Sequence, residues 1–366
     1  MTERKLTIIH LESSTGWGGQ EIRILNESRW FVERGHQVIL IAPKESKIYQ
    51  AFCERGWPVY HCSFLYRNSL WTLLFLISTF RLIRPDAVNT HSNADSKIGL
   101  LAARLAGVKN IIRSRHVSNP IHNSWHNQFL YKHLATHVVT TGDCISKEAI
   151  KLGVPHQRVT TVASGIEIPT EESSNLSLKA ELRLEANTIL IGMVSVLRSW
   201  KGHTFLIEAF HQLLQDFPNL HLILAGDGPM KERLQKLVRE LQIEHHVHLL
   251  GHRTDVFHIF QNLEIALLTS TKNEGIPQSL IQAMACNCPV IGANVGGIPE
   301  LLCNGDFGTL VPPQNSNSIK LAIKKILTTP LQFKDITKAA FIHVKSNYHI
   351  DSMGSKMINI YGHFIK

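Results

Sequence analysis

The sequence predicts an α/β protein built from two doubly wound, parallel-sheet domains. Its 366 residues are more than one hydrophobic core usually fills, which favours two domains. Short, almost continuously apolar segments alternate with helix-length segments, as expected for strands that helices cover on both faces of a parallel sheet. The alternation runs to residue 167 and starts again at residue 189, so we expect two domains of similar size.

The first half contains seven strand-length segments. After the first of them, Gly18 and Gly19 are expected to begin a helix that runs toward Arg34. The most apolar helix candidate is LWTLLFLISTF (70–80), well short of the roughly 20 residues that span a bilayer. The expected strands are KLTIIHL (5–11), GHQVILIAP (35–43), WPVYHC (57–62), AVNTH (87–91), NIIRSRH (110–116), HVVTTG (137–142) and RVTTVASGIE (158–167).

The second half repeats the pattern with five strand-length segments. The polar segment IPTEESSNLS (168–177) contains a proline and is expected to link the domains, which places the first domain at 1–168 and the second at 169–345. The expected strands are ILIGMVSVL (189–197), LHLILAGDG (220–228), VHLLG (247–251), IALLTS (265–270) and PVIGAN (289–294), with helices at His203–Phe217, Met230–Leu241 and Pro277–Met284.

Positive charge is concentrated in the first domain. The formal net charge is +9, and residues 1–169 carry 20 Lys and Arg against 12 Asp and Glu. Such a field favours an anionic partner, such as acidic lipid headgroups or a phosphorylated glycan, while a basic surface kept for solubility is the alternative. Arg67, Arg81 and Arg84 flank the apolar helix candidate, so either burial or contact with a membrane surface is expected of it.

Several classes of protein are not expected. No nucleic-acid reading motif or aromatic platform accompanies the positive charge, so nucleic acid is not an expected partner. The six cysteines show no spacing typical of a disulfide framework or a zinc site, which indicates reduced thiols and a cytoplasmic protein. The apolar run near the N-terminus has the length of a strand rather than of a signal-peptide core.

Glycine and histidine residues follow the strands of the first domain, where parallel sheets bind ligands. Gly18 and Gly19 suit either a close approach to a phosphate or a simple tight turn. His116, in RSRHVSN, is a candidate for contact with a sugar hydroxyl or for proton transfer. His91, in NTHSNADS at the preceding strand end, is its competitor, and the two alternatives stay open.

Charged residues follow the strands of the second domain. Arg198 and Lys201 lie three residues apart near a helix start, which suits a diphosphate clamp or an ordinary solvated pair. Glu274 directly precedes a Gly-Ile-Pro turn whose exposed amides could take phosphates while the carboxylate accepts hydrogen bonds from a neutral sugar. Gln282 lies eight residues after Glu274, in the helix expected at Pro277–Met284. It could meet ribose-type hydroxyls without adding a second negative charge.

Four sequence blocks together resemble the family 4 glycosyltransferases, which have the GT-B fold. The blocks are NEGIPQSLIQAMACNCPVIGANVGGIPELL (273–302), HSNADSKIGLLAARLAG (91–107), VLRSWKGH (196–203) and AGDGP (225–229). The resemblance covers essentially the whole chain and implies two Rossmann-like domains that face a cleft. It implies an acceptor bound mainly by the first domain, a nucleotide-sugar donor bound mainly by the second, and a C-terminal helix (346–366) that crosses back to the first domain.

The resemblance also implies a role for each matching residue. Glu274 would hold the hydroxyls of the donor sugar, and His116 would touch that sugar near its reacting carbon. Arg198 and Lys201 would neutralise the leaving diphosphate, which Gly19 would approach from the other domain. The implied catalytic residues are His116 and Glu274, and the implied donor-binding residues are Gly18, Gly19, Arg198, Lys201, Gly226, Arg253, Gly275, Ile276, Pro277, Gln278 and Gln282.

Three positions depart from the family pattern. Gln282 stands where a second glutamate is usual, which weakens any statement about the nucleotide. Arg198 lies three residues before Lys201 rather than the common five, so its side chain would enter from a different angle. Asn287 stands where glycine is frequent, which we interpret as the C-terminal turn of a helix.

The expected activity is transfer of a sugar, with retention of configuration, from a nucleotide-sugar of UDP type. A lipid-linked or phosphorylated glycan is the expected acceptor, in lipopolysaccharide or surface polysaccharide synthesis at the inner membrane face. No cofactor or metal is expected besides the nucleotide-sugar. A nucleotide-sugar epimerase of similar fold and a non-catalytic nucleotide-sugar-binding protein are the alternatives.

Overall fold

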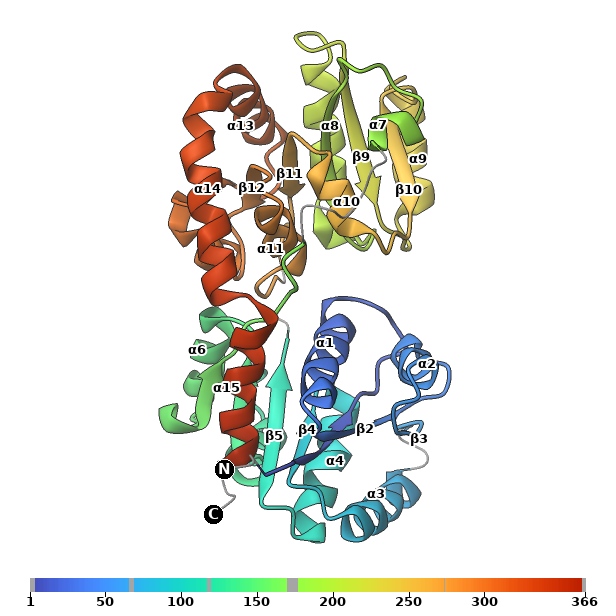
Figure 1. Ribbon diagram of the computed structural model, residues 1–366, viewed down its shortest axis with the longest axis vertical. Coiled ribbons are helices and arrows are strands. Elements are labelled where there is room, and N and C mark those ends of the chain that lie inside the picture. Colours follow the sequence, from blue (N-terminus) through green and yellow to red (C-terminus); the bar gives the residue numbers. More distant parts are fainter. Residues whose placement is uncertain (1–3, 66–68, 117–119, 170–176, 273, 364–366) are drawn as a thin grey trace. The chain divides into compact units, whose positions relative to one another are not determined.

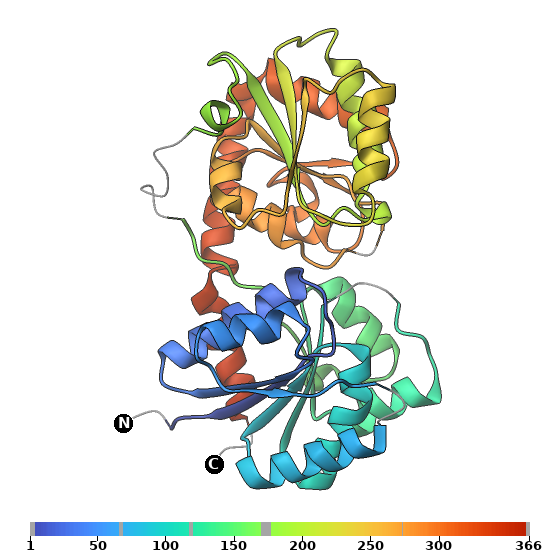
Figure 2. The same ribbon diagram turned by 90° about the vertical axis from the view of Figure 1, so that its right-hand side faces the viewer.

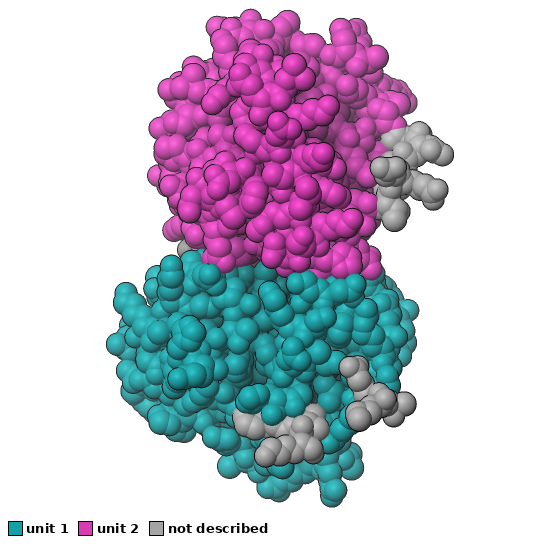
Figure 3. Space-filling model, turned by 60° about the vertical axis from the view of Figure 1, so that its left-hand side comes forward, with its two compact units in different colours: residues 1–165, 350–366 teal, residues 166–349 magenta. Residues whose placement is uncertain are grey.

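The computed structural model describes residues 4–65, 69–116, 120–169, 177–272 and 274–363. The chain divides into two compact units, residues 1–165 with 350–366 (unit 1) and residues 166–349 (unit 2), coloured separately in Figure 3. Most of the expected linker lies outside the described residues, as do Arg67 and Asn273.

Unit 1 is built around a seven-stranded parallel sheet with the order β3-β2-β1-β4-β5-β6-β7 (Figure 1). All seven strands predicted for the first half are present, and each is shorter than its apolar segment. The strands are β1 (Thr7–Leu11), β2 (Gln37–Ala42), β3 (Val59–His61), β4 (Ala87–Thr90), β5 (Asn110–Arg115), β6 (His137–Thr140) and β7 (Val159–Thr161).

Helices cover both faces of this sheet, as Figure 2 shows. Ile8 and Ile9 are both fully buried, but Ile8 packs with the core that includes α1 and α15, whereas Ile9 packs with the core that includes α3 and α4. Successive side chains of a strand point to opposite faces, so a strand with both faces covered is continuously apolar. The helices are α1 (Gly19–Glu33), α2 (Lys47–Glu54), α3 (Ser69–Ile83), α4 (Asn93–Ala106), α5 (Trp125–Phe129), α6 (Asp143–Lys151) and α15 (Ile350–Gly362), with the short turns η2 (Leu130–Leu134) and η3 (His156–Arg158).

Unit 2 contains a six-stranded parallel sheet with the order β10-β9-β8-β11-β12-β13. The five strands predicted for the second half are present, and the edge strand β13 is an addition that the sequence did not predict. The strands are β8 (Ile189–Val194), β9 (Leu220–Ala225), β10 (Val247–Gly251), β11 (Ile265–Leu268), β12 (Val290–Ala293) and β13 (Thr309–Val311).

The helices of unit 2 also lie on both sides of its sheet (Figure 2). The three predicted helices are present as α8, α9 and α11. The helices are α7 (Leu178–Glu181), α8 (His203–Leu213), α9 (Lys231–Glu240), α10 (Val256–Gln261), α11 (Gln278–Ala285), α12 (Ile298–Leu301), α13 (Ser316–Thr328) and α14 (Pro330–Asn347), with the short turns η4 (Ser199–Lys201) and η5 (Cys303–Gly305).

Each sheet has one point at which its strand order reverses. In unit 1 this point lies between β1 and β4, and in unit 2 it lies between β8 and β11. Loops that leave these strands in opposite directions open a crevice at the carboxyl edge, where doubly wound sheets bind ligands. Among the described residues, none of the helices combines the length and apolar composition needed to cross a bilayer.

Candidate active site

In unit 2, the loops after β8 and β11 bring the predicted residues Lys201 and Glu274 together. Lys201 Nζ lies 2.6 Å from Glu274 Oε1, and the Ser270 hydroxyl donates to the same oxygen at 2.5 Å. The Glu274 side chain is only 7% exposed and that of Lys201 is 19% exposed, so water screens this ion pair weakly. The geometry places one cation and one carboxylate side by side at the point where the strand order reverses.

Backbone contacts hold the loops after β8 and β12 close to the loop after β11. Gly202 has φ +76°, and a Cβ at this position would lie 1.9 Å from Thr269 O. Gly296 has φ +57°, and its Cβ would lie 2.0 Å from Glu274 O. Because only glycine fits both the backbone conformation and the space, these positions fix how the loops carrying Lys201 and Glu274 approach.

Arg198 occupies a different environment from Lys201. It caps the short turn η4 and is exposed, and its guanidinium carbon lies 5.0 Å from the centre of the Trp200 ring. Stacking on an indole orients a guanidinium while its N–H groups stay available to a ligand. The two predicted clamp residues therefore have different partners: Lys201 contacts a carboxylate, and Arg198 stacks on an aromatic ring.

Helix α11 begins beside Glu274. Pro277 is its N-terminal cap, and Gln278 and Gln282, four residues apart, share one face of the helix. The side-chain nitrogen of Gln278 is buried and has no hydrogen-bond partner among the described residues, so its N–H groups are not engaged by another described side chain or backbone group. Asn287 has φ +53° just after the helix, which confirms the predicted C-terminal turn.

The other residues of unit 2 that were predicted to bind the donor lie in the same loops or further along the sheet edge. Gly275 and Ile276 connect Glu274 to α11, and the Gly226 amide donates to Gly251 O at 2.7 Å in the loop after β9. Arg253 follows β10 and forms ion pairs with Glu181 and Asp255. These carboxylates raise the pKa of Arg253 and engage its guanidinium, so a nucleotide contact there stays a prediction.

In unit 1, Gly18 is the cap of α1 and Gly19 is its first residue, as predicted. The Gly18 amide donates to Glu21 Oε2 at 2.8 Å, so a carboxylate of the chain already uses this donor. Glu12, at the end of β1, is buried and accepts hydrogen bonds from the Ser14 amide and the Ser92 hydroxyl. Burial, and then the nearby charge of Asp95, raise the pKa of Glu12 to about 8.

The two competing histidines of the sequence prediction are hydrogen-bonded to each other. His91 Nδ1 lies 3.0 Å from His116 Nε2, and His91 Nε2 lies 2.9 Å from His10 Nδ1. They lie at the ends of the adjacent strands β1, β4 and β5, so the sheet aligns them in a row. Burial lowers the pKa of His10 to about 3 and holds those of His91 and His116 well below 6.5, so all three are neutral.

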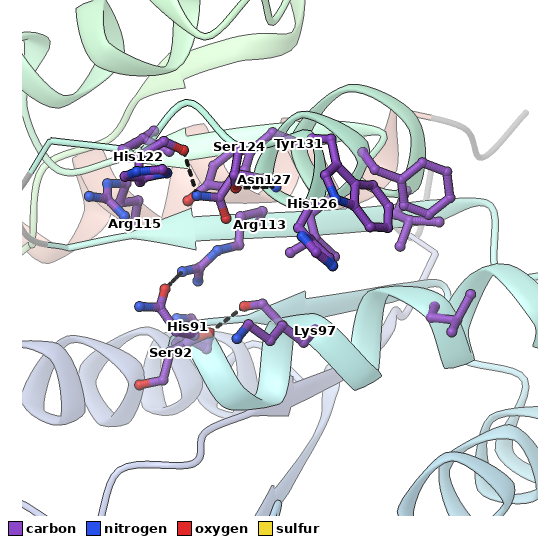
Figure 4. Close-up of a pocket in the computed structure, with 18 of the residues that line it drawn as sticks. His91, Ser92, Lys97, Arg113, Arg115, His122, Ser124, His126, Asn127 and Tyr131 are labelled. Carbon is purple, nitrogen blue, oxygen red and sulfur yellow. Dashed lines mark hydrogen bonds between the residues drawn. The ribbon is translucent and has the colours of Figure 1, made fainter. Parts of the chain in front are cut away.

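A cavity of about 950 Å³ in unit 1 is lined by His116 and by basic and aromatic residues. Figure 4 shows Arg113 extending from β5 toward the start of α4, where it donates to Asn93 Oδ1 at 3.3 Å, and Lys97 on α4. Burial alone would raise the pKa of Tyr131, yet Arg113 and Arg115 lower it, which indicates a positive potential in the cavity. The cavity is chemically suited to an anionic group beside an apolar or sugar surface.

Sequence reasoning missed several of these residues. Ser270, Glu12 and His10 were not singled out, although each lies at or beside the end of an expected strand, and this position was the available signal. Nothing in their spacing indicated burial or their partners. Among the described residues, no group of three or more His, Cys, Asp or Glu side chains is arranged to hold a metal ion.

Comparisons with known proteins match both halves of the chain. Residues 17–168 match the family described as Glycosyltransferase Family 4, and residues 175–342 match the family described as Glycosyl transferases group 1. The N-acetyl-α-D-glucosaminyl L-malate synthase of Bacillus anthracis is 30% identical over 174 residues, which are 47% of this chain and 45% of that protein.

A second relative is an N-acetylgalactosaminyltransferase of Campylobacter jejuni whose name gives a diphospho-undecaprenol-linked acceptor. It is 32% identical over 154 residues, which are 42% of this chain and 41% of that protein. The matched segments span between 33% and 62% of the length of the first three curated relatives.

The fold is shared with solved structures over almost the whole chain. HepE of Anabaena, solved in complex with UDP-glucose, superposes with a TM-score of 0.86 at 21% identity, covering 98% of this chain and 100% of that one. This likeness confirms the predicted GT-B fold of two Rossmann-like domains. With its first half matching family 4 and its second half matching group 1, the chain belongs to the GT-B superfamily of glycosyltransferases.

Proposed function

We propose that the protein is a retaining glycosyltransferase that moves a sugar from a UDP-sugar to an anionic glycan acceptor. The observation that carries this proposal is the shielded Lys201–Glu274 pair beside the start of α11. It sets a cation suited to a diphosphate next to a carboxylate suited to sugar hydroxyls. The UDP-glucose bound in the structurally similar Anabaena protein supports a UDP-sugar as the donor.

The proposed chemistry depends on stabilising one departing charge. Breaking the bond between sugar and phosphate leaves a diphosphate, whose charge Lys201 and Arg198 neutralise, and the buried amide of Gln278 offers a further donor. Removing one preorganised donor of this kind typically costs about 10²–10³ in rate. We propose front-side attack, in which the leaving phosphate accepts the proton of the acceptor hydroxyl. Trapping a covalent glycosyl-enzyme would contradict this course.

The proposed acceptor binds in the cavity of unit 1. Its buried Arg113 and Arg115, with Lys97, favour a phosphate or carboxylate group, and Trp125 and Tyr131 provide aromatic surface for a sugar. The diphospho-undecaprenol-linked acceptor in the name of the Campylobacter relative supports an acceptor of this class. We therefore propose a lipid-linked or phosphorylated glycan, as used in lipopolysaccharide or surface polysaccharide synthesis.

Helix α3 supports an association with anionic membranes. Leu70, Trp71, Leu74 and Leu82 expose between 49% and 84% of their surface along this helix, and Leu105 of α4 extends the apolar area. Arg81 of α3, Arg84 directly after α3 and Arg104 of α4 are also exposed. Apolar side chains with flanking cations are the chemistry of helices that lie at the surface of an anionic bilayer. We propose that unit 1 binds such a surface through α3.

Donor and activity are tested together. A thermal-shift series with UDP-, GDP- and ADP-sugars is expected to show the largest stabilisation with a UDP-sugar, because a bound ligand raises Tm by mass action. Transfer to a phosphorylated glycan, followed by NMR of the new linkage, is expected to show retention. Donor turnover without any acceptor would favour an epimerase, and tight donor binding with no transfer would favour a binding protein.

Membrane association is tested by sedimentation with vesicles. The protein is expected to bind vesicles that contain anionic lipid more strongly than neutral vesicles, and W71S is expected to weaken this binding. Leu331 of α14 is similarly exposed, so L331S serves as a matched control that leaves binding unchanged. Binding that did not respond to anionic lipid would remove the support for this surface.

A further inference from the structure

The hydrogen-bonded residues His10, His91 and His116 form a histidine chain in unit 1. One end of this chain is His116, and the other end, His10, faces Glu27 of α1. His10 Nε2 lies 3.9 Å from Glu27 Oε1, and both side chains are fully buried. The Tyr361 hydroxyl, from α15, donates to the same carboxylate oxygen and itself accepts from Asn89 Nδ2 at 2.7 Å. Hydrogen bonds therefore join His10 through His91 to His116, which lines the cavity. The contact between His10 Nε2 and Glu27 is longer than a hydrogen bond, and among the described residues this buried nitrogen has no hydrogen-bond partner, so Glu27 acts on it through its charge.

The partners of Glu27 indicate that it is ionised. Its Oε1 faces the Tyr361 hydroxyl and His10, and its Oε2 lies 3.8 Å from Arg23 Nε. The pKa of Glu27 is raised, with burial as the largest cause, while the charge of Arg23 and the hydrogen bond from Tyr361 limit the rise. The pKa of Tyr361 is itself raised well above 10, so this residue remains a hydroxyl donor. The Arg23 guanidinium and the Tyr361 hydroxyl are donors in either case, and both favour an acceptor, the carboxylate form of Glu27.

A neutral imidazole carries one N–H, so a chain of three has only two consistent arrangements. In the first, His10 Nε2–H points at Glu27, and every following histidine donates from Nε2 to the Nδ1 atom of its neighbour. In the second, all three carry the proton on Nδ1, and the Nε2 lone pair of His10 faces the carboxylate. An anion attracts an N–H and repels a lone pair, so an ionised Glu27 selects the first arrangement.

The other charged groups near the chain do not supply a competing acceptor. The charged side chains that lower the pKa of His91 and His116 are Arg23 of α1 and Arg113 and Arg115 of β5, all of them cations. The Asp95 carboxylate of α4 accepts from the His91 backbone amide at 2.8 Å, and within the described part of the protein no hydrogen bond joins it to an imidazole of the histidine chain. Among the described residues, His116 Nδ1 is buried and has no hydrogen-bond partner. In the first arrangement this atom carries a lone pair, and in the second it carries a proton.

We propose that Glu27, acting through His10 and His91, holds His116 in the Nε2–H tautomer and so makes His116 Nδ1 a hydrogen-bond acceptor. Glu27, His10 and His91 are positioning residues that lie behind His116 in the core of unit 1. The use of this acceptor rests on the proposed function, in which a hydroxyl of the substrate donates to His116. The tautomer itself does not depend on that function.

The wild-type protein alone provides the first test. Nitrogen NMR of ¹⁵N-histidine-labelled protein distinguishes protonated from unprotonated ring nitrogens, and single His→Gln variants assign the signals of His10, His91 and His116. We expect a protonated Nε2 and an unprotonated Nδ1 in all three, without any ligand present. A protonated Nδ1 on His116 would overturn the proposal.

Substitution of Glu27 provides the second test. E27Q removes the charge and is expected to move the proton of His116 to Nδ1, while E27D keeps the charge and the wild-type tautomer. E33Q, at an exposed acid on the same helix, is the matched control and is expected to change nothing. If E27Q keeps the wild-type tautomer, the inference is wrong.

Activity separates this inference from the proposed function. E27Q is expected to lower the transfer rate about tenfold, the equivalent of one lost hydrogen bond, with UDP affinity unchanged. A protein that shows the expected tautomers but neither binds nor uses a UDP-sugar would refute the proposed function. The inference about the tautomer of His116 would still stand. Should E27Q lower UDP affinity as strongly as the rate, its effect would be structural and the positioning role would be refuted.

Discussion

The ion pair between Lys201 and Glu274 predicts that one substitution strengthens product binding and strongly lowers the rate of transfer. In the ligand-free site, Glu274 neutralises the cation that would meet the diphosphate. E274Q removes this competition, so UDP affinity is expected to rise about tenfold, the equivalent of one charge-assisted hydrogen bond. The same change removes the carboxylate that would orient the sugar, so transfer is expected to fall by about 10² or more.

The stability cost follows from the burial of the pair. The side chains of Glu274 and Lys201 are 7% and 19% exposed. Removing one partner of a fully buried pair costs about 3–5 kcal/mol. The partial exposure of Lys201, and the amide oxygen that still accepts from it and from Ser270, reduce this to about 1–3 kcal/mol. For a domain of this size the corresponding fall in Tm is about 2–12 °C.

Calorimetric titration with UDP and with the UDP-sugar measures the binding effect. K201M is expected to weaken the binding of both ligands, which is opposite in sign to the effect of E274Q on UDP. The matched control is D216N, because Asp216 and Lys324 form an ion pair of similar length, 2.7 Å, with side chains that are 48% and 45% exposed. D216N is expected to change stability by less than about 1 kcal/mol and to leave UDP binding unaltered. Weaker UDP binding by E274Q would refute the reasoning.

Three further predictions concern other parts of the two units. G202A is expected to lower the urea midpoint of unfolding, at a cost of about 2 kcal/mol or more, because its Cβ would lie 1.9 Å from Thr269 O. Native Glu12 keeps its proton up to about pH 8, whereas in the unfolded chain this carboxyl loses its proton near pH 4.5. Between these two pH values the native state binds more protons than the unfolded state, so the free energy of unfolding falls as pH rises. E12Q is expected to flatten that fall in urea unfolding measured across the window. R113M is expected to raise KM for a phosphorylated acceptor about tenfold and to leave UDP binding unchanged, as steady-state kinetics and titration would show.

The strands could be predicted where burial on both faces leaves an almost continuously apolar segment. β1 and β8 are of this kind, and their segments stand out in the sequence. β13 has only three residues at the edge of its sheet, and two of them are partly exposed, so no comparable signal exists there. The predicted helix of 203–217 ends in the structure at Leu213, because local pattern locates a helix better than it locates its end.

The site could be predicted as separate residues but not as pairs. Lys201 and Glu274 each follow a strand, and the motif around each is recognisable, but they are 73 positions apart in the chain and the sequence alone does not show their contact. His91 and His116 were competing candidates because each follows a strand, and their positions in the sequence do not show that they contact each other. In the structure they are successive members of one hydrogen-bonded row, since β4 and β5 are neighbours in the sheet.

The two units use the same topology to build sites of different character. In unit 2 the loops at the point of strand reversal meet through backbone, as where Gly202 lies against Thr269 O, so the geometry of Lys201 and Glu274 is set by main-chain packing. In unit 1 the corresponding loops meet through buried titratable side chains, among them Glu12 and the histidine row. A site fixed by backbone keeps its shape across pH, whereas a site fixed by buried side chains depends on where each proton lies. Changes of pH should therefore alter the chemistry of unit 1 before they alter nucleotide binding by unit 2, and comparing the pH dependence of UDP affinity with that of transfer measures this difference.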